Sequence, residues 1–147
     1  MPFLSLTRLR LRSVRFLPVF ALYTIRCNRQ VKRSGGFLGG SLLPDRKLTF
    51  WTLTMWDREE AMRAYMVSGA HKEAMPHLMN WCDEASVTHW DQTEDNLPSW
   101  EEADRRMRAS GRVSKVRFPS ADHAGLTYRE PRLTGSAPIR PVQVQNA

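Results

Sequence analysis

Polar and apolar positions alternate at the start of the chain. Between Leu6 and Val14, the side chains of Arg8, Arg10 and Arg12 fall on one side, while leucines and small polar residues fall on the other. A repeat of two residues is typical of a β-strand with different surroundings on its two faces. We therefore predict a first strand here, with its leucines toward packed helices and its arginines facing away from them.

The remainder of the chain changes between strand and helix patterns. A repeat of three and four residues predicts helices, and glycine, proline or a polar cap marks most of their ends. The predicted elements after the first strand are a helix at 16–33, strands at 37–43 and 48–56, helical pieces at 57–69 and 70–83, a strand at 85–90, a short helix at 99–111 and a short strand at 113–118. This order predicts an α+β fold with a ferredoxin-like β-α-β-β-α-β sheet, whose first and third strands lie at the centre.

The same pattern sets the domain organisation. Residues 1–118 are predicted to form one ferredoxin-like α+β barrel domain with an added C-terminal helix. From residue 119 to residue 147, Gly, Pro, Thr and Gln dominate without any repeat, so we predict a disordered tail.

The third predicted strand carries large apolar side chains on both of its faces. A sheet in a small monomer usually buries only one face, so the second must be covered by a partner subunit or by a ligand. We therefore predict a homodimer in which two sheets shield each other. The two sets are Leu48, Phe50 and Trp56 on one face and Trp51, Leu53 and Met55 on the other.

Composition narrows the class of protein. Two cysteines among 147 residues are too few for a disulfide framework and indicate reduced thiols, as expected in the cytoplasm. The longest nearly apolar run, 16–25, is well short of the roughly 20 residues that span a bilayer, so no transmembrane segment is expected. No nucleophile elbow, phosphate-binding loop, dinucleotide motif or zinc-type histidine pair appears either.

Positive charge is concentrated near the start of the chain. The net charge is +7, and residues 1–44 contain eight bases and no acid. This asymmetry indicates an anionic partner, such as a membrane surface, nucleic acid or an acidic ligand, with a solvated basic face as the alternative. No aromatic RNA-binding motif is present, so we do not expect nucleic acid.

Several stretches together carry a family likeness. They are FLGG at 37–40, FWTLT at 50–54, Trp56, AMRAY at 61–65, SGAH at 68–71, AMP at 74–76 and WCDEA at 81–85. They resemble the spheroidene monooxygenase-like group of the dimeric α+β barrel superfamily, which also contains antibiotic biosynthesis monooxygenases. The likeness extends from about Leu6 to Phe118.

The resemblance implies a pocket between sheet and helices, an apolar small-molecule substrate and haem as a cofactor. In haem-degrading relatives a Trp is followed ten residues later by an iron-ligating His, and these positions fall on Tyr65 and Met75 here. The expected imidazole is therefore missing at Met75, which stays a candidate cofactor-binding residue beside His71. His71 lies four residues earlier on the same helical face and is the nearest substitute ligand.

Other candidate site residues follow from the predicted strands. Arg10 and Arg12 would bind either carboxylates of a partner subunit or a ligand carboxylate such as a haem propionate. Trp51 and Tyr65 are candidates for the substrate pocket. Two functions remain open: a small monooxygenase acting on an apolar substrate, or a non-catalytic dimeric barrel that binds a small apolar or anionic ligand. A third alternative is an interaction protein that docks its basic N-terminal third on an anionic surface.

Overall fold

β1 (Phe3–Leu11) lies near the centre of a six-stranded sheet in the computed structural model, which describes residues 1–142. A single 3₁₀ turn, η1 (Val14–Phe16), leads into the first long helix. The other elements are α1 (Leu17–Lys32), β2 (Phe37–Asp45), β3 (Thr49–Trp56), α2 (Glu59–Met66), α3 (Gly69–Trp81), β4 (Cys82–Asp91), α4 (Trp100–Ser110), β5 (Arg112–Val113) and β6 (Ala137–Ile139).

The strand order confirms the predicted ferredoxin-like sheet. The strands lie in the order β5-β4-β1-β3-β2-β6, and every neighbouring pair is antiparallel. The four strands of the β-α-β-β-α-β unit form the middle of this order, with β1 and β3 at its centre. The short strands β5 and β6 extend the sheet at its two edges.

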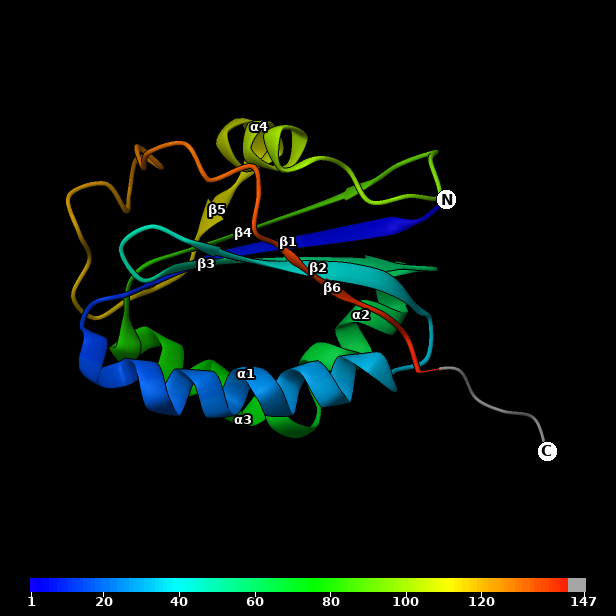
Figure 1. Ribbon diagram of the computed structural model, residues 1–147, viewed down its shortest axis with the longest axis horizontal. Helices are drawn as coiled ribbons and strands as arrows, with labels where there is room; N and C mark the ends of the chain where they lie inside the picture. Colours follow the sequence, from blue (N-terminus) through cyan, green and yellow to red (C-terminus); the bar gives the residue numbers. More distant parts are fainter. Residues whose placement is uncertain (143–147) are drawn as a thin grey trace.

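The molecule has three layers (Figure 1). The helices α1, α2 and α3 cover one face of the sheet, called here the inner face, and α4 lies across the opposite, outer face. Alternation along β1 decides which side chain meets which layer. Thr7 and Leu9 face inward, whereas Leu6 and Arg8 face outward, as the strand pattern predicted.

The outer face is covered by the chain itself. Trp51 and Leu53 of β3 pack in one apolar cluster with Trp100 and Met107 of α4 and with Tyr128 of the following segment. The second apolar face of β3 is therefore buried within one copy of the chain. This removes the reason for expecting a homodimer through that face.

The segment after Phe118 differs from the disordered tail that the sequence predicted. It crosses the outer side of the sheet, buries His123 and Tyr128, and ends as β6, which pairs with β2 and buries Ile139 (Figure 1). A few buried anchors between Gly and Pro residues hold it, and such spacing produces no periodic pattern in the sequence. Residues 143–147 of the predicted tail lie outside the described residues.

Helices long and apolar enough to cross a bilayer do not occur within residues 1–142.

Candidate functional site

A pocket of about 380 Å³ lies between the inner face of the sheet and the helices that cover it. This volume falls in the range of small-molecule sites, about 300–1,000 Å³. Most of the pocket wall is apolar, as such sites usually are. Aromatic and sulfur-containing side chains of the three helices dominate it: Phe20, Tyr23, Met62, Tyr65, Met66, Met75, Met79 and Trp81.

The floor of the pocket is formed by hydroxyl groups of the two central strands. Ser5 is paired with Thr54, and Thr7 with Thr52, across the β1–β3 ladder. Directly paired residues on one face have Cβ atoms about 5 Å apart, so these four side chains form one compact patch. Thr54 already accepts a hydrogen bond from the indole of Trp56 at 2.9 Å. The floor therefore offers hydroxyls to the polar atoms of a ligand beneath apolar walls.

His71 is held at the helical side of the pocket by Gln30 of α1. The backbone N–H of His71 donates to Oε1 of Gln30 at 2.9 Å, and Nε2 of Gln30 donates to the carbonyl oxygens of Tyr65 and Ser68 at 3.1 and 2.7 Å. Gly69 adopts a left-handed φ of +56° beside the Gln30 amide. One side chain of α1 thus fixes the junction of α2 and α3, from which His71 enters the pocket lining.

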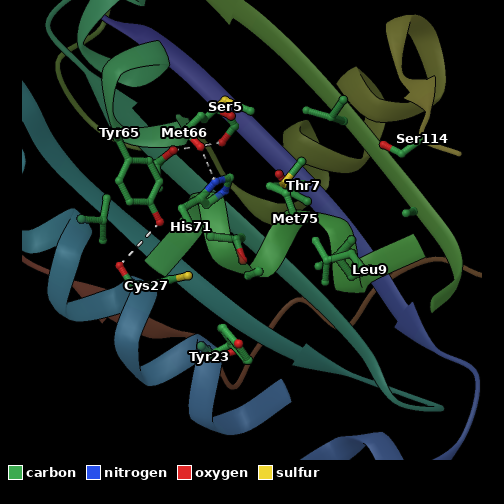
Figure 2. Close-up of a pocket in the computed structure, with 18 of the residues that line it drawn as sticks. Ser5, Thr7, Leu9, Tyr23, Cys27, Tyr65, Met66, His71, Met75 and Ser114 are labelled. Atoms are coloured by element: carbon green, nitrogen blue, oxygen red, sulfur yellow. Dashed lines mark hydrogen bonds between the residues drawn. The ribbon is translucent and has the colours of Figure 1, made fainter. Parts of the chain in front are cut away.

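The protonation state of His71 follows from its contacts. Nδ1 lies 3.1 Å from the carbonyl oxygen of Met66, and a carbonyl only accepts, so Nδ1 carries the proton (Figure 2). Burial lowers the pKa of His71, while the bond to Met66 partly opposes this shift. The ring is therefore neutral near pH 7, and its Nε2 has an unshared electron pair and no hydrogen-bond partner among the described residues.

Tyr65 and Met75, two further candidates from the sequence, also line this pocket. The Tyr65 ring lies 4.8 Å from the His71 ring, and its hydroxyl points toward the carbonyl oxygen of Cys27 at 3.5 Å (Figure 2). Burial raises the pKa of Tyr65, so its hydroxyl stays protonated and acts as a donor. The structure thus brings His71, Tyr65 and Met75 together, as the sequence predicted.

Arg10 and Arg12, in contrast, do not line the pocket. Arg10 forms a paired contact with Asp83 at 3.0 and 2.9 Å and an ion pair with Glu84 at 2.8 Å on the outer face. Arg12 donates to the backbone carbonyl of Asn80 at 2.6 Å. The strand alternation that pointed these arginines away from the helices also points Arg10 away from the pocket. Both are engaged by the chain's own acceptors.

Trp51 also lies on the outer face rather than in the pocket. Its side chain is fully buried, its indole N–H donates to Asp45 at 3.1 Å, and its ring meets Tyr128 edge-on. Both faces of β3 are apolar, so the sequence pattern did not reveal which face borders the pocket. Two other aromatic residues of β3 belong to the inner face: Trp56 packs against Tyr65, and Phe50 packs against Phe20.

The lining residues do not fit a haem in the way the resemblance implied. The two arginines assigned to the propionates lie elsewhere. Among the described residues that line the pocket, Lys115 is the one lysine, and no arginine is present. His71 and Met75 remain as candidate ligands four residues apart on α3. The described residues also contain no group of three His, Cys, Asp or Glu side chains arranged for a metal ion.

Sequence reasoning missed most of the pocket floor. Ser5, Thr7, Thr52 and Thr54 are polar, and the pattern of buried strands highlights apolar positions instead. The alternation in β1 contained the signal, because Thr7 shares a face with Leu9. Asn28 was missed as well; its buried Oδ1 has no hydrogen-bond partner among the described residues, although Asn28 lines the pocket.

The comparison with protein families places the chain. The family model called domain of unknown function DUF3291 matches residues 30–116. The chain belongs to this family. The matched region runs from the end of α1 past β5 and thus includes His71, Tyr65 and Met75. Membership of the spheroidene monooxygenase-like group stays a prediction, and no curated protein matches the chain.

Solved structures share the fold at low sequence identity. A conserved protein from Methanosarcina mazei Go1 is 12% identical with a TM-score of 0.57, covering 63% of this chain and 94% of its own. An antibiotic biosynthesis monooxygenase is 10% identical with a TM-score of 0.56, covering 63% and 99%. SnoaB from Streptomyces nogalater, described as a cofactor-independent oxygenase, is 17% identical with a TM-score of 0.51, covering 66% and 97%. These likenesses show that the chain shares the α+β fold of these proteins.

Proposed function

We propose that this member of the DUF3291 family is a small oxygenase that takes a largely apolar organic molecule into the inner pocket and uses His71 as a general base. The observation that carries the proposal is the neutral His71 ring in an apolar pocket, with Nδ1 bound to Met66 and Nε2 free. The fold shared with SnoaB, a cofactor-independent oxygenase, supports the reaction class.

The chemistry needs a base when the substrate itself supplies the electrons to O₂, because an anion gives up electrons more readily than the neutral acid. Nε2 of His71 takes the proton from an acidic C–H or O–H group of the substrate. The substrate anion then forms a bond from carbon to oxygen, and return of the proton gives a hydroperoxide. In sum, one substrate molecule and one O₂ combine, and no other reactant is consumed.

Two features of the pocket suit this reaction. The hydroxyls of Thr7 and Thr52 lie on the floor, where they can donate to a keto or phenolate oxygen as its charge develops. The apolar helical wall excludes water, which strengthens these polar contacts. Haem dependence is not part of this proposal, because the lining residues do not supply the expected propionate partners.

The test separates binding from turnover. Displacement of 1-anilinonaphthalene-8-sulfonate measures entry of compounds with an acidic C–H or phenolic group, and an oxygen electrode measures consumption of O₂. We expect His71→Gln to retain binding and to lose about a hundredfold or more in rate. His77→Gln, at an exposed position of the same helix, is the matched control and should leave the rate unchanged.

The second candidate function is a non-catalytic binding protein. It is favoured by the hydroxyl floor and the unpartnered Asn28 Oδ1, which suit ligand binding without any reaction. Binding without O₂ consumption across the compound series supports this function and contradicts the oxygenase. Equal rates for His71→Gln and the unchanged chain would show that His71 is not the base.

A further inference from the structure

α1 has two different faces, and the one turned away from the sheet has no cover. Phe20, Cys27 and Val31 point toward the sheet and the pocket. On the opposite side, Pro18, Leu22, Ile25 and Arg29 recur at steps of four, three and four residues, so they form one line along the helix. These four residues are called here the α1 patch.

The α1 patch exposes apolar side chains that the fold does not need. Leu22 is 55% exposed and Ile25 is 52% exposed, and both lie in the middle of the helix. Val14, on η1 just before the helix, is 66% exposed. Single exposed apolar residues are normal, but here they are neighbours in one line on a long helix.

Unpaired positive charge surrounds this line. Of the eight bases in the first 44 residues, four have partners: Arg8 and Arg10 pair with acids of β4, Arg12 donates to Asn80, and Arg26 pairs with Glu73. The other four form no ion pair within the described residues, and all lie on η1, on α1 or directly after it. They are Arg15, Arg29, Lys32 and Arg33.

The helix dipole explains only part of this arrangement. Cations in the last turn of α1 stabilise the negative end of the dipole, which accounts for Lys32 and its neighbours. The dipole does not account for exposed Leu22 and Ile25, nor for Arg15 near the other end of the helix. Aliphatic side chains with cations on both sides are the pattern of helices that lie in a membrane interface.

We propose that the α1 patch docks the protein on an anionic lipid bilayer, with Leu22 and Ile25 entering the boundary between headgroups and acyl chains. The cations around them would contact the lipid phosphates and carboxylates. α1 belongs to the helical layer that covers the pocket and packs against α3 (Figure 1). Met75 of α3 lines the pocket and is itself partly exposed. The inference is independent of the reaction proposed above.

Other occupants fit the patch less well. A second copy related by two-fold symmetry would bring the unpaired cations of two helices together, which is unfavourable. Single-stranded nucleic acid is usually held by stacking on aromatic rings, whereas the exposed centre of the patch is aliphatic. A helix face is also convex, which suits a flat, deformable surface better than a small anionic ligand.

Vesicle sedimentation tests the inference with the full chain. We expect binding to vesicles of phosphatidylcholine and phosphatidylserine in equal amounts, weak binding to phosphatidylcholine alone, and loss of binding as salt increases. Arg29→Gln with Arg33→Gln should weaken the partition roughly thirtyfold, since each cation near the surface contributes about a factor of five. Leu22→Ser with Ile25→Ser should weaken it by at least tenfold at constant charge.

The control removes the same charge from another surface. Arg46→Gln with Arg132→Gln changes two exposed arginines away from α1 and should leave vesicle binding unchanged. All these side chains are exposed, so the variants should unfold at the same urea concentration as the unchanged chain. The proposal is overturned if the control pair loses as much vesicle binding as Arg29→Gln with Arg33→Gln. It is also overturned if Leu22→Ser with Ile25→Ser leaves vesicle binding unchanged. Binding of single-stranded RNA or poly-glutamate as tight as that of the vesicles overturns it in favour of nucleic acid or an acidic protein.

Discussion

The ring of Tyr128 packs edge-on against the ring of Trp51, with their centroids 5.5 Å apart, and joins the C-terminal segment to the centre of the sheet. The guanidinium carbon of Arg8 lies over the same Tyr128 ring, 4.0 Å from its centroid, and the Tyr128 hydroxyl donates to Asp104 of α4 at 2.7 Å. One side chain thus connects β1, β3 and α4. It shows why the segment after α4 belongs to the folded unit.

This relationship predicts the effect of two substitutions on stability. Tyr128→Ala removes a buried ring, and we expect it to lower the free energy of unfolding by about 3–5 kcal/mol. Tyr128→Phe keeps the ring but loses the hydrogen bond to the Asp104 carboxylate, and should cost about 1.5–3 kcal/mol. Urea unfolding followed by tryptophan fluorescence measures both. Leu133→Ala, at an exposed position of the same segment, should change stability little.

Glu84 provides a second prediction, because it neutralises the charge of the buried Arg8 and also pairs with the partly exposed Arg10. It lies 2.8 Å from both Arg8 and Arg10, and its side chain is 2% exposed. Glu84→Gln leaves the Arg8 charge buried without its counter-ion, and we expect a loss of about 3–5 kcal/mol of unfolding free energy.

The double variant Arg8→Met with Glu84→Leu separates the effect of an unpaired buried charge from the effect of altered packing at these positions. Replacing both charges by apolar groups removes the desolvation cost of each, so this variant should be more stable than Glu84→Gln. If the two variants were equally unstable in urea, packing at this position rather than an unpaired charge would explain the loss.

The covered outer face predicts the mass of the protein in solution. α4 and Tyr128 occupy the surface through which two sheets would have met, so we expect sedimentation equilibrium to give the mass of one 17.0 kDa chain. A species of twice that mass would require a dimer through another surface. Repeating the measurement with Leu22→Ser and Ile25→Ser would then show whether α1 takes part.

Two partly buried histidines, His71 and His89, predict a pH dependence of stability. Burial lowers the pKa of His71 and of His89 below the ordinary value of 6.5. As the pH falls, the unfolded chain therefore binds protons at a higher pH than the folded chain does. The stabilisation that the neutral rings provide is fully present above pH 6.5 and is lost as the pH falls through the lowered pKa values of the folded chain. His71→Gln should show a shallower decline of unfolding free energy than the unchanged chain between pH 7 and pH 5. Parallel curves for the two proteins would contradict this.

Sequence patterns predicted the inner architecture well. The alternation in β1 gave the direction of Arg8 and Arg10, and the element order gave a sheet with β1 and β3 at its centre. Both features depend on local periodicity, which side-chain burial imposes directly on the sequence. His71, Tyr65 and Met75 were named as candidates through the family resemblance, and the structure brings them together because they lie close in sequence on the adjacent helices α2 and α3.

The errors concern contacts between residues distant in sequence. Nothing local to Trp51 indicates that a tyrosine 77 positions later covers it, and the partners of Arg10 lie 73 and 74 positions away. A partner subunit and a distant segment of the same chain can both cover an apolar face of a sheet, so the sequence pattern alone does not indicate which of them covers β3. The hydroxyl floor was missed for the opposite reason: its residues look like ordinary polar strand positions until the ladder pairs them.

The pairing of β6 with β2 has a practical consequence for handling the protein. β2 would otherwise end the sheet with free N–H and C=O groups, and such an edge is a template on which strands of other molecules add. Residues 137–139 cover this edge and so prevent strands of other molecules from adding to β2. The nearby N–H of Val142 donates to the carbonyl oxygen of Lys32 at 2.9 Å and helps to hold this segment in place. An expression tag placed after β6 should therefore be separated from it by a flexible spacer. Shortened versions that stop before residue 137 would leave the edge of β2 uncovered and are expected to aggregate.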